Sequence, residues 1–372
     1  MNSRNDALNA ICPYFTMFPL DFPQRVIAEY HEPNTAILDP FCGRGTSLFA
    51  ARKSGIYSIG IDSSPVAAAI ARSKVLCTTP EKILLVAKRI LSSNKNPQVP
   101  VGEFWEYAYH PETLYSICKL RESLLNNCST PERQALCAIL LGALHGPLSQ
   151  HGTSYLSNQC PRTYSPKPNY SIKFWKDRGM TPPKVDVLDI ISLRANRYFP
   201  SIYEPYTGLV LKEDSTKPKV FKKISSNIAK VNTALGLIIT SPPYYGMRTY
   251  IPDQWLRNWF VGGLPIVDYS TSSQISHSGI DMFVNELKTV WLHCATITAR
   301  NGKIAVRFGA INDRVVDPET IIRRSFDDTP WSIIKVDQAG IPSQKSRQLN
   351  SFSKVKSPKA QIEEIDIIAE LR

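Results

Sequence analysis

One stretch decides the fold that this sequence predicts: Ala36-Ile37-Leu38-Asp39-Pro40-Phe41-Cys42-Gly43-Arg44-Gly45-Thr46. It begins as a short apolar strand and runs into a glycine loop, which opens a helix over residues 47–54. Glycine allows the backbone to approach a ligand closely, because it carries no side chain. A strand, a glycine loop and a helix in this order are typical of the start of a nucleotide-binding α/β fold.

A second strand is expected at residues 57–61, and it ends in an acid, Asp62. Asp62 lies 62 − 43 = 19 residues after Gly43, near the roughly 20-residue spacing of a carboxylate that holds ribose hydroxyls. The loop is not the dinucleotide fingerprint, because one residue separates Gly43 from Gly45 and no third glycine follows at the required place. The sequence therefore predicts a ribose-binding acid next to a glycine loop of another type.

Another apolar strand, residues 235–239, ends in a rigid turn, Thr240-Ser241-Pro242-Pro243-Tyr244. The two prolines fix φ and remove two backbone N–H donors, and each keeps the preceding residue out of the helical region. The turn then presents a serine hydroxyl and carbonyl oxygens, with an aromatic ring behind them. It could hold a flat ring that carries an amino group: the ring stacks on the tyrosine, and the amine donates to the serine and to a carbonyl. A strand end followed by a simple proline turn is the alternative.

Together these stretches resemble the S-adenosylmethionine-dependent DNA amino-methyltransferases. In that family Asp-Pro-Phe-x-Gly-x-Gly-Thr is the cofactor loop and Ser-Pro-Pro-Tyr is the catalytic loop, and both are complete here. The resemblance implies S-adenosyl-L-methionine as the cofactor. It implies catalytic roles for four residues: Ser241, Pro242, Pro243 and Tyr244. It implies cofactor contacts at ten residues: Asp39, Phe41, Gly43, Gly45, Thr46, Asp62, Ser63, Asp214, Thr240 and Phe18.

The resemblance also implies the reaction, which is methyl transfer to the exocyclic amine of a base flipped out of double-stranded DNA. The Ser form of the catalytic loop is commoner in enzymes that methylate N4 of cytosine, and the Asp form is commoner for N6 of adenine. Three alternatives stay open: adenine N6 in DNA, a guanine amine in RNA or tRNA, and an inactive nucleic-acid-binding partner. Carbon methylation is discounted, because it needs a cysteine after a proline and Cys160-Pro161 has the reverse order.

Alternating strands and helices predict an α/β, doubly wound sheet of the methyltransferase type. An antiparallel edge is expected from strands at residues 331–336 and 362–371. Residues 1–78 and 206–372 are expected to form the catalytic domain, and residues 79–205 an inserted, mainly helical and basic domain that is a candidate for target recognition. Because ligands sit at the carboxyl ends of strands in such sheets, Asp39, Asp62 and Thr240 are expected to share one cleft.

The composition agrees with a nucleic-acid partner. The 372-residue chain carries a formal net charge of +12, and 43% of its residues are hydrophobic, as in a globular protein that binds a polyanion. Aromatic and basic residues alternate over residues 151–200, which indicates either DNA contact or a loop packed on the inserted helices. A second basic run, residues 338–361, contains no acid.

The sequence also predicts a cytoplasmic protein. No apolar run approaches the roughly 20 residues of a membrane span, and we expect no signal peptide. The eight cysteines include no Cys-x-x-Cys pair, so we expect reduced thiols and no metal site. Associated restriction or defence proteins are candidate partners, and the sequence makes no prediction of the oligomeric state.

Overall fold

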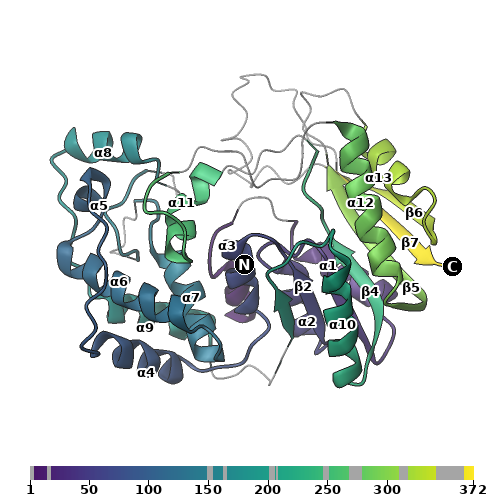
Figure 1. Ribbon diagram of the computed structural model, residues 1–372, viewed down its shortest axis with the longest axis horizontal. Coiled ribbons are helices and arrows are strands. Elements are labelled where there is room, and N and C mark those ends of the chain that lie inside the picture. The colour runs from purple at the N-terminus through teal and green to yellow at the C-terminus, as the bar shows by residue number, and fades with distance from the viewer. Residues whose placement is uncertain are drawn as a thin grey trace. The chain divides into compact units, whose positions relative to one another are not determined.

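The structure is a computed structural model, and it divides into two compact units (Figure 1). The helical unit consists of Met1–Pro13, Arg72–Pro205 and Tyr250–Thr271, and the sheet unit of Tyr14–Ala71, Tyr206–Thr249 and Ser272–Arg372. The division predicted from the sequence, with residues 79–205 as an insert, stays a prediction. The residues described are 4–14, 18–148, 154–161, 166–200, 206, 208–245, 251–267, 279–309, 317–340 and 364–372.

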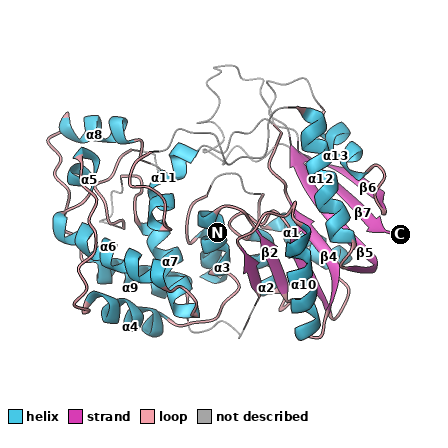
Figure 2. Cartoon of the chain, in the orientation of Figure 1, coloured by secondary structure: helices cyan, strands magenta, loops and turns pink. Residues whose placement is uncertain are grey.

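The sheet unit is built on one seven-stranded sheet (Figure 2). Its strands are β1 (Thr35–Asp39), β2 (Ser58–Ile61), β3 (Leu209–Leu211), β4 (Ala234–Thr240), β5 (Thr298–Gly309), β6 (Trp331–Gly340) and β7 (Glu364–Leu371). Their spatial order is β3-β2-β1-β4-β5-β7-β6. The first five are parallel, and β7 runs antiparallel to both β5 and β6. The predicted α/β sheet with an antiparallel edge is therefore confirmed.

Both faces of this sheet are apolar, because successive residues of a strand point to opposite faces. Leu38 packs on one side with residues of α10 (Pro218–Lys230), α12 (Ile280–Ala295) and α13 (Pro318–Phe326). Ile37 packs on the other side with residues of α1 (Asp21–Tyr30) and α2 (Thr46–Lys53). The remaining helix of this region, α3, spans Pro65–Arg72. The core is thus two apolar layers with the parallel strands between them.

One predicted element is wrong in its extent. The local sequence pattern predicts a helix over residues 281–300, but α12 ends at Ala295 and β5 already begins at Thr298. Thr298 pairs with Leu235 of β4. The gain from this long-range strand pairing overrides the local helical pattern.

In its described residues, the helical unit contains the short 3-10 helix η1 (Arg4–Ala10) and seven α-helices. These are α4 (Pro80–Leu91), α5 (Glu103–Ala108), α6 (Pro111–Asn126), α7 (Pro131–Ala143), α8 (Pro168–Lys176), α9 (Val187–Tyr198) and α11 (Ile251–Phe260). The Thr130 side chain accepts a hydrogen bond from the Arg133 amide, and Pro131 follows at the first position, so these two residues begin α7. In the described parts of the chain, no helix is both long and apolar enough to cross a membrane.

A buried ion pair joins β5 to β7. The Arg307 guanidinium contacts both carboxylate oxygens of Asp366 at 2.7 Å, and Arg25 of α1 reaches the same carboxylate at 2.5 Å. Arg307 and Asp366 are nearly fully buried, so neither charge is screened by water. Its bidentate geometry fixes how β7 aligns with β5 at this end of the sheet.

We predict that Asp366→Ala lowers the free energy of unfolding by about 3–5 kcal/mol, because it leaves the Arg307 charge buried and unpaired. Glu370→Ala, on the same strand, is the matched control. The Lys303 Nζ atom lies 3.4 Å from the Glu370 carboxylate, and the Glu370 side chain is 38% exposed. The expected loss in the free energy of unfolding is therefore under about 1 kcal/mol. Urea denaturation of both variants measures the difference, and equal losses would contradict this account.

Candidate active site

Asp39 joins three elements at the carboxyl end of β1. One of its oxygens accepts hydrogen bonds from the Thr240 hydroxyl at 2.7 Å and from the Phe41 amide at 3.1 Å. The other accepts a hydrogen bond from the Ser47 hydroxyl at the start of α2. Since Thr240 ends β4, the glycine loop and the Ser-Pro-Pro-Tyr turn are tied to one carboxylate. This contact lies at the point where the order of the sheet reverses, between β1 and β4, which is where ligands bind in open α/β sheets.

Asp62 holds the glycine loop from the end of β2. Its carboxylate accepts hydrogen bonds from the Gly43 amide at 2.9 Å and the Ser64 amide at 2.8 Å. Each carboxylate oxygen has two lone pairs, so acceptor positions remain for a ligand's hydroxyl groups. The structure therefore gives Asp62 a loop-fixing contact that the sequence did not indicate, in addition to its predicted ribose contact.

The glycines of the loop serve different purposes. Gly43 has φ +50°, and a side chain there would project into open space. Gly45 has φ +79°, and a Cβ atom there would lie 3.2 Å from Ala71. Gly60 of β2 lets the loop pack onto the sheet, because a Cβ atom would lie 2.8 Å from the Cys42 sulfur. A side chain would therefore be crowded at Gly45 and Gly60 but not at Gly43. The open space at Gly43 fits a ligand that approaches the backbone there.

The Ser-Pro-Pro-Tyr turn continues directly from β4. Ser241 is half-buried, Pro242 is buried and Pro243 is exposed. The Tyr244 ring is buried and meets the Phe308 ring edge-on, with centroids 5.7 Å apart. Its hydroxyl donates a hydrogen bond to Glu364 of β7 at 2.5 Å. The open stacking surface expected at Tyr244 is therefore occupied by packing in this structure, and the ring supports the turn from behind.

The other predicted cofactor contacts are more scattered. Thr46 is buried at the start of α2, and Ser63 is exposed after Asp62. The Phe41 ring meets Trp291 of α12 edge-on, at 6.2 Å between centroids. Phe18 packs edge-on against Phe22 of α1 at 5.3 Å, so the structure gives it a packing role.

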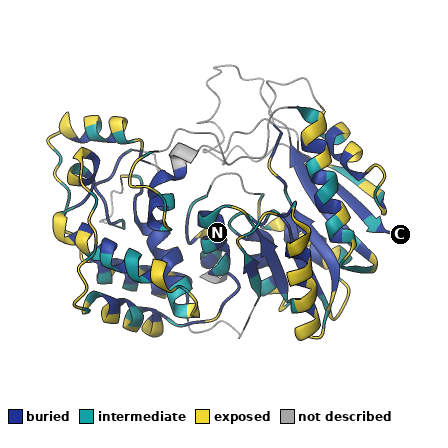
Figure 3. Ribbon diagram, in the orientation of Figure 1, coloured by how far each residue is buried: buried dark blue, intermediate teal, exposed yellow. Residues whose placement is uncertain are grey.

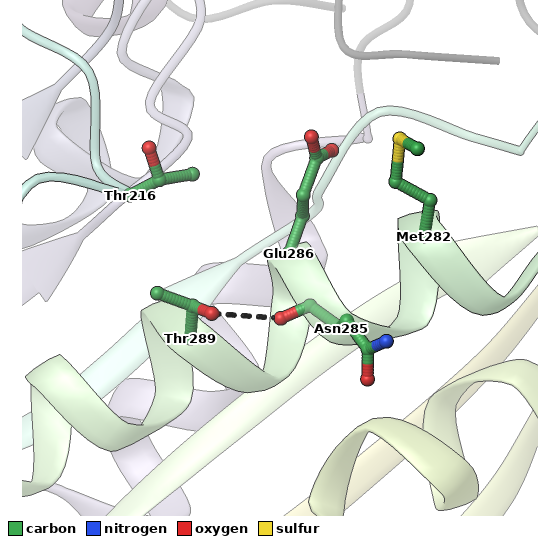
Figure 4. Close-up of a pocket in the computed structure, with 5 residues that line it drawn as sticks. All are labelled: Thr216, Met282, Asn285, Glu286 and Thr289. Atoms are coloured by element: carbon green, nitrogen blue, oxygen red, sulfur yellow. Dashed lines mark hydrogen bonds between the residues drawn. The ribbon is translucent and has the colours of Figure 1, made fainter. Parts of the chain in front are cut away.

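Asp214 lies beyond β3, and its hydrogen-bond partner Thr216 lines a pocket of about 420 Å³ (Figure 4). Its carboxylate accepts hydrogen bonds from the Thr216 amide at 2.9 Å and the Thr216 hydroxyl at 2.7 Å. The Glu286 side chain of α12 also lines this pocket. One of its carboxylate oxygens is buried and has no hydrogen-bond partner among the described residues. Burial raises the pKa of Glu286. The lining residues are Thr216, Met282, Asn285, Glu286 and Thr289.

Burial dominates the electrostatics of both strand-end acids. It raises the pKa of Asp39 to about 6, although hydrogen bonds from Ser47 and Thr240 favour the charged form. It also raises the pKa of Asp62 to about 6, against the hydrogen bonds from Ser64 and Gly43. Both carboxyls are therefore ionised at neutral pH and accept hydrogen bonds. Within the described ranges, no three His, Cys, Asp or Glu side chains are grouped to hold a metal.

Sequence reasoning missed Glu364 and Ser47. Glu364 contacts Tyr244 across 120 residues of sequence, and no local pattern marks such a partner. Ser47 lies eight residues after Asp39, and it reaches the carboxylate because the loop turns back between them. A polar residue at the start of a buried helix, as Ser47 is here, is the signal that could have indicated such a contact.

Comparison with known proteins finds a family similarity in the first part of the chain. Residues 2–73 match the model of the N6/N4 DNA methylase family. The match is confined to this segment, which is less than half of the chain. The segment contains Asp39, the glycine loop and Asp62, so it confirms the resemblance to DNA amino-methyltransferases and supports S-adenosylmethionine as the cofactor. The Ser-Pro-Pro-Tyr turn lies outside it, and no curated protein matches the chain.

Solved methyltransferase structures are similar only at low identity. The rRNA methyltransferase aviRa from Streptomyces viridochromogenes is 12% identical, with 100% of this chain and 93% of that chain covered and a TM-score of 0.38. Magnesium protoporphyrin IX methyltransferase from Synechocystis PCC 6803, solved with bound SAM, is 8% identical, with 100% and 92% covered and a TM-score of 0.35. Likeness at this level indicates neither an activity nor a substrate for this chain.

The raised pKa of Asp39 predicts a pH dependence of stability. The folded chain keeps the Asp39 proton up to about pH 6, whereas the unfolded chain loses it near pH 3.9. The folded state therefore binds more protons in this window, and the contribution of Asp39 to stability falls as pH rises from about 4 to about 6. We predict that Asp39→Asn, which has no carboxyl group at this position, abolishes this fall in stability between about pH 4 and about pH 6.

The measurement is the free energy of unfolding in urea at several pH values between 4 and 7. The difference between wild type and Asp39→Asn should change across the window and become constant above it. Ser225→Ala, on the exposed face of α10, changes no titratable group, so it is the control and should leave the pH profile unchanged. Parallel profiles for wild type and Asp39→Asn would overturn the assignment.

The Tyr244–Glu364 contact predicts a coupling between two distant positions. Tyr244→Phe removes the donor and leaves the Glu364 carboxylate buried without it, so we expect a loss of stability of about 1–3 kcal/mol. Glu364→Gln keeps an acceptor and should cost less than Glu364→Ala. In a double-mutant cycle of Tyr244→Phe with Glu364→Ala, measured by urea denaturation, the coupling should be about 0.5–3 kcal/mol. Additive losses would show that the hydroxyl and the carboxylate do not act together.

Proposed function

We propose that this protein transfers a methyl group from S-adenosylmethionine to the exocyclic amine of a base in DNA, with cytosine N4 as the first candidate. One observation carries the proposal: the 2.7 Å hydrogen bond between Asp39 and Thr240. It joins the predicted cofactor loop to the predicted catalytic turn where the order of the strands reverses. The DNA methylase segment at residues 2–73 supports the same reaction class.

The residues of the glycine loop fit the cofactor. Space above Gly43 admits a ligand close to the backbone, and Asp62 retains acceptor positions for ribose hydroxyls. When bound, S-adenosylmethionine supplies an electrophilic methyl group on a sulfonium. Asp39 can contribute to catalysis without contacting the cofactor, by positioning the residues that do. Its hydrogen bonds keep the glycine loop and the end of β4 in register, and misplacement by an ångström would slow transfer strongly.

The catalytic turn acts on the amine. An aromatic amine is a poor nucleophile, because its lone pair is delocalised into the ring. Hydrogen bonds from the amine to the Ser241 hydroxyl and the Pro242 carbonyl favour a pyramidal nitrogen with its lone pair free to attack. The two prolines keep these acceptors fixed, and Tyr244 anchors the turn through Glu364. As the nitrogen accepted the methyl group, the methyl–sulfur bond would break with its electron pair left on sulfur, and the nitrogen would be positively charged until it released a proton. These hydrogen bonds would therefore strengthen during the reaction.

The remaining parts of the proposal follow from this chemistry. The amine of a paired base is hidden in the duplex, so the base must be flipped out, and double-stranded DNA is the proposed substrate. Residues 1–78 and 206–372 are proposed to carry catalysis, and residues 79–205 to contact the target. A cytoplasmic location and associated restriction proteins belong to the same proposal. Adenine N6 in DNA and a guanine amine in RNA are the alternatives that the experiment separates.

The test is mass spectrometry of nucleosides from DNA and RNA incubated with the protein and S-adenosylmethionine. N4-methylcytosine in DNA is the expected product. N6-methyladenine would overturn the choice of base and leave the amine chemistry intact, whereas methylation of RNA alone would overturn the substrate. No methylated nucleoside, together with no cofactor binding by calorimetry, would support the inactive partner.

We predict that Ser241→Ala lowers turnover about 10- to 150-fold, the value of one hydrogen bond to a charged group. Its affinity for S-adenosylmethionine should stay close to that of the wild type, because the cofactor is assigned to Gly43 and Asp62. Ser225→Ala, on the exposed face of α10, is the matched control and should keep full turnover. Turnover unchanged in Ser241→Ala would remove the serine from the mechanism.

A further inference from the structure

Three side chains form a column along α8 of the helical unit. The rings of Tyr170 and Phe174 are stacked, with centroids 6.3 Å apart and planes 24° apart. The Arg178 guanidinium lies 4.0 Å from the centroid of the Phe174 ring. These residues are four positions apart, which places them on one face of a helix and its continuation.

The column is held in place from its other side. Trp175 is fully buried, and its indole N–H donates a hydrogen bond to the Gln159 carbonyl at 3.0 Å. Tyr170, in contrast, is 56% exposed, and Figure 3 shows exposed residues along α8. The helix is therefore anchored by one aromatic residue and presents another to solvent. An aromatic ring that is fixed from behind and open in front can stack on a flat ligand with little loss of conformational freedom.

Basic side chains surround this column. Residues 167–178 contain four basic residues and a single acid, Asp177. Lys176 is paired with Glu103, whereas Lys173 and Arg178 are exposed, and Arg178 lies over the Phe174 ring. Aromatic rings interleaved with cations are what a nucleic-acid strand requires, because the bases stack on the rings and the phosphates meet the cations. The four basic residues are Lys167, Lys173, Lys176 and Arg178.

We propose that this face of α8 binds DNA, with an unpaired base stacked on Tyr170 and phosphates beside Lys167 and Lys173. The proposal rests on the proposed function, since it assigns a contact surface for the DNA substrate. A base inside a duplex has both faces covered, so the surface selects single-stranded or opened DNA. Every base has a π face, so the contact is independent of sequence and holds the strand without reading it.

The test compares Tyr170→Ala with Tyr115→Ala in the full-length protein. Tyr115 of α6 is a matched control, because it is 38% exposed and Lys119 lies 5.9 Å from its ring. Affinity is measured by fluorescence anisotropy with a mixed-sequence single-stranded DNA oligonucleotide. Tyr170→Ala should weaken binding about 5- to 150-fold and Tyr170→Phe should retain most of it, whereas Tyr115→Ala should bind as the wild type does. Binding to a fully paired duplex should change less.

The salt dependence of DNA affinity tests the charged residues of this surface. Removing Lys167 and Lys173 together should flatten the slope of log affinity against log salt by about 1.4, if each meets one phosphate of a single strand. Lys88→Ala with Lys82→Ala, two exposed lysines of α4, is the control and should leave the slope unchanged. Binding of an RNA oligonucleotide in preference to the matched DNA would overturn DNA as the partner.

The outcomes separate this surface from the methyl-transfer proposal. If wild type methylates DNA and Tyr170→Ala binds DNA with unchanged affinity, the surface is wrong and the reaction stands. If wild type yields no methylated nucleoside but Tyr170→Ala loses DNA affinity, the reaction is wrong and the surface stands. Equal losses in Tyr170→Ala and Tyr115→Ala would also overturn the surface, because the effect would not be specific to α8.

Discussion

The sheet unit depends on how one buried carboxylate is satisfied. Asp39 is fully buried at the end of β1, where an unpaired charge would be very costly. It is stabilised by donors from three parts of the chain: the Thr240 hydroxyl, the Ser47 hydroxyl and the Phe41 amide. Each of these donors can reach it only if β4, α2 and the glycine loop are in their observed positions. The requirement to satisfy this charge therefore fixes the relative placement of the two loops.

Buried polar contacts also hold the antiparallel edge of the sheet. Tyr244 is held by Glu364, and β7 is held by the ion pair between Asp366 and Arg307. The turn after β4 is therefore supported on one side by Asp39 and on the other by the start of β7. Burial raises the pKa of both Tyr244 and Glu364, so the tyrosine stays protonated and remains the donor. A rigid turn suits chemistry in which positioning supplies most of the rate.

The strands, the two loops and their convergence could be predicted from the sequence, whereas the contacts between distant residues could not. The strands at Asp39 and Thr240 were readable because apolar runs ending at glycine or proline are local signals. Their convergence followed from a general property of parallel sheets. The contact with Glu364 was not readable, since it joins residues 120 positions apart. The burial of Tyr244 was not readable for the same reason, because its partner is distant in the sequence, and its catalytic role stays a prediction. Most of the basic run at 338–361 lies outside the described residues, so its part in DNA contact stays a prediction.

The position of β7 between β5 and β6 has a consequence for how this sheet assembles. Among the described strands, β6 pairs only with β7, although β6 comes first in the chain. β6 therefore joins the sheet only through β7. Pairing of β7 with β5 also brings Asp366 to Arg307 and Glu364 to Tyr244. A change that frees β7 would thus detach β6 from the sheet and remove the support of the turn after β4 at the same time.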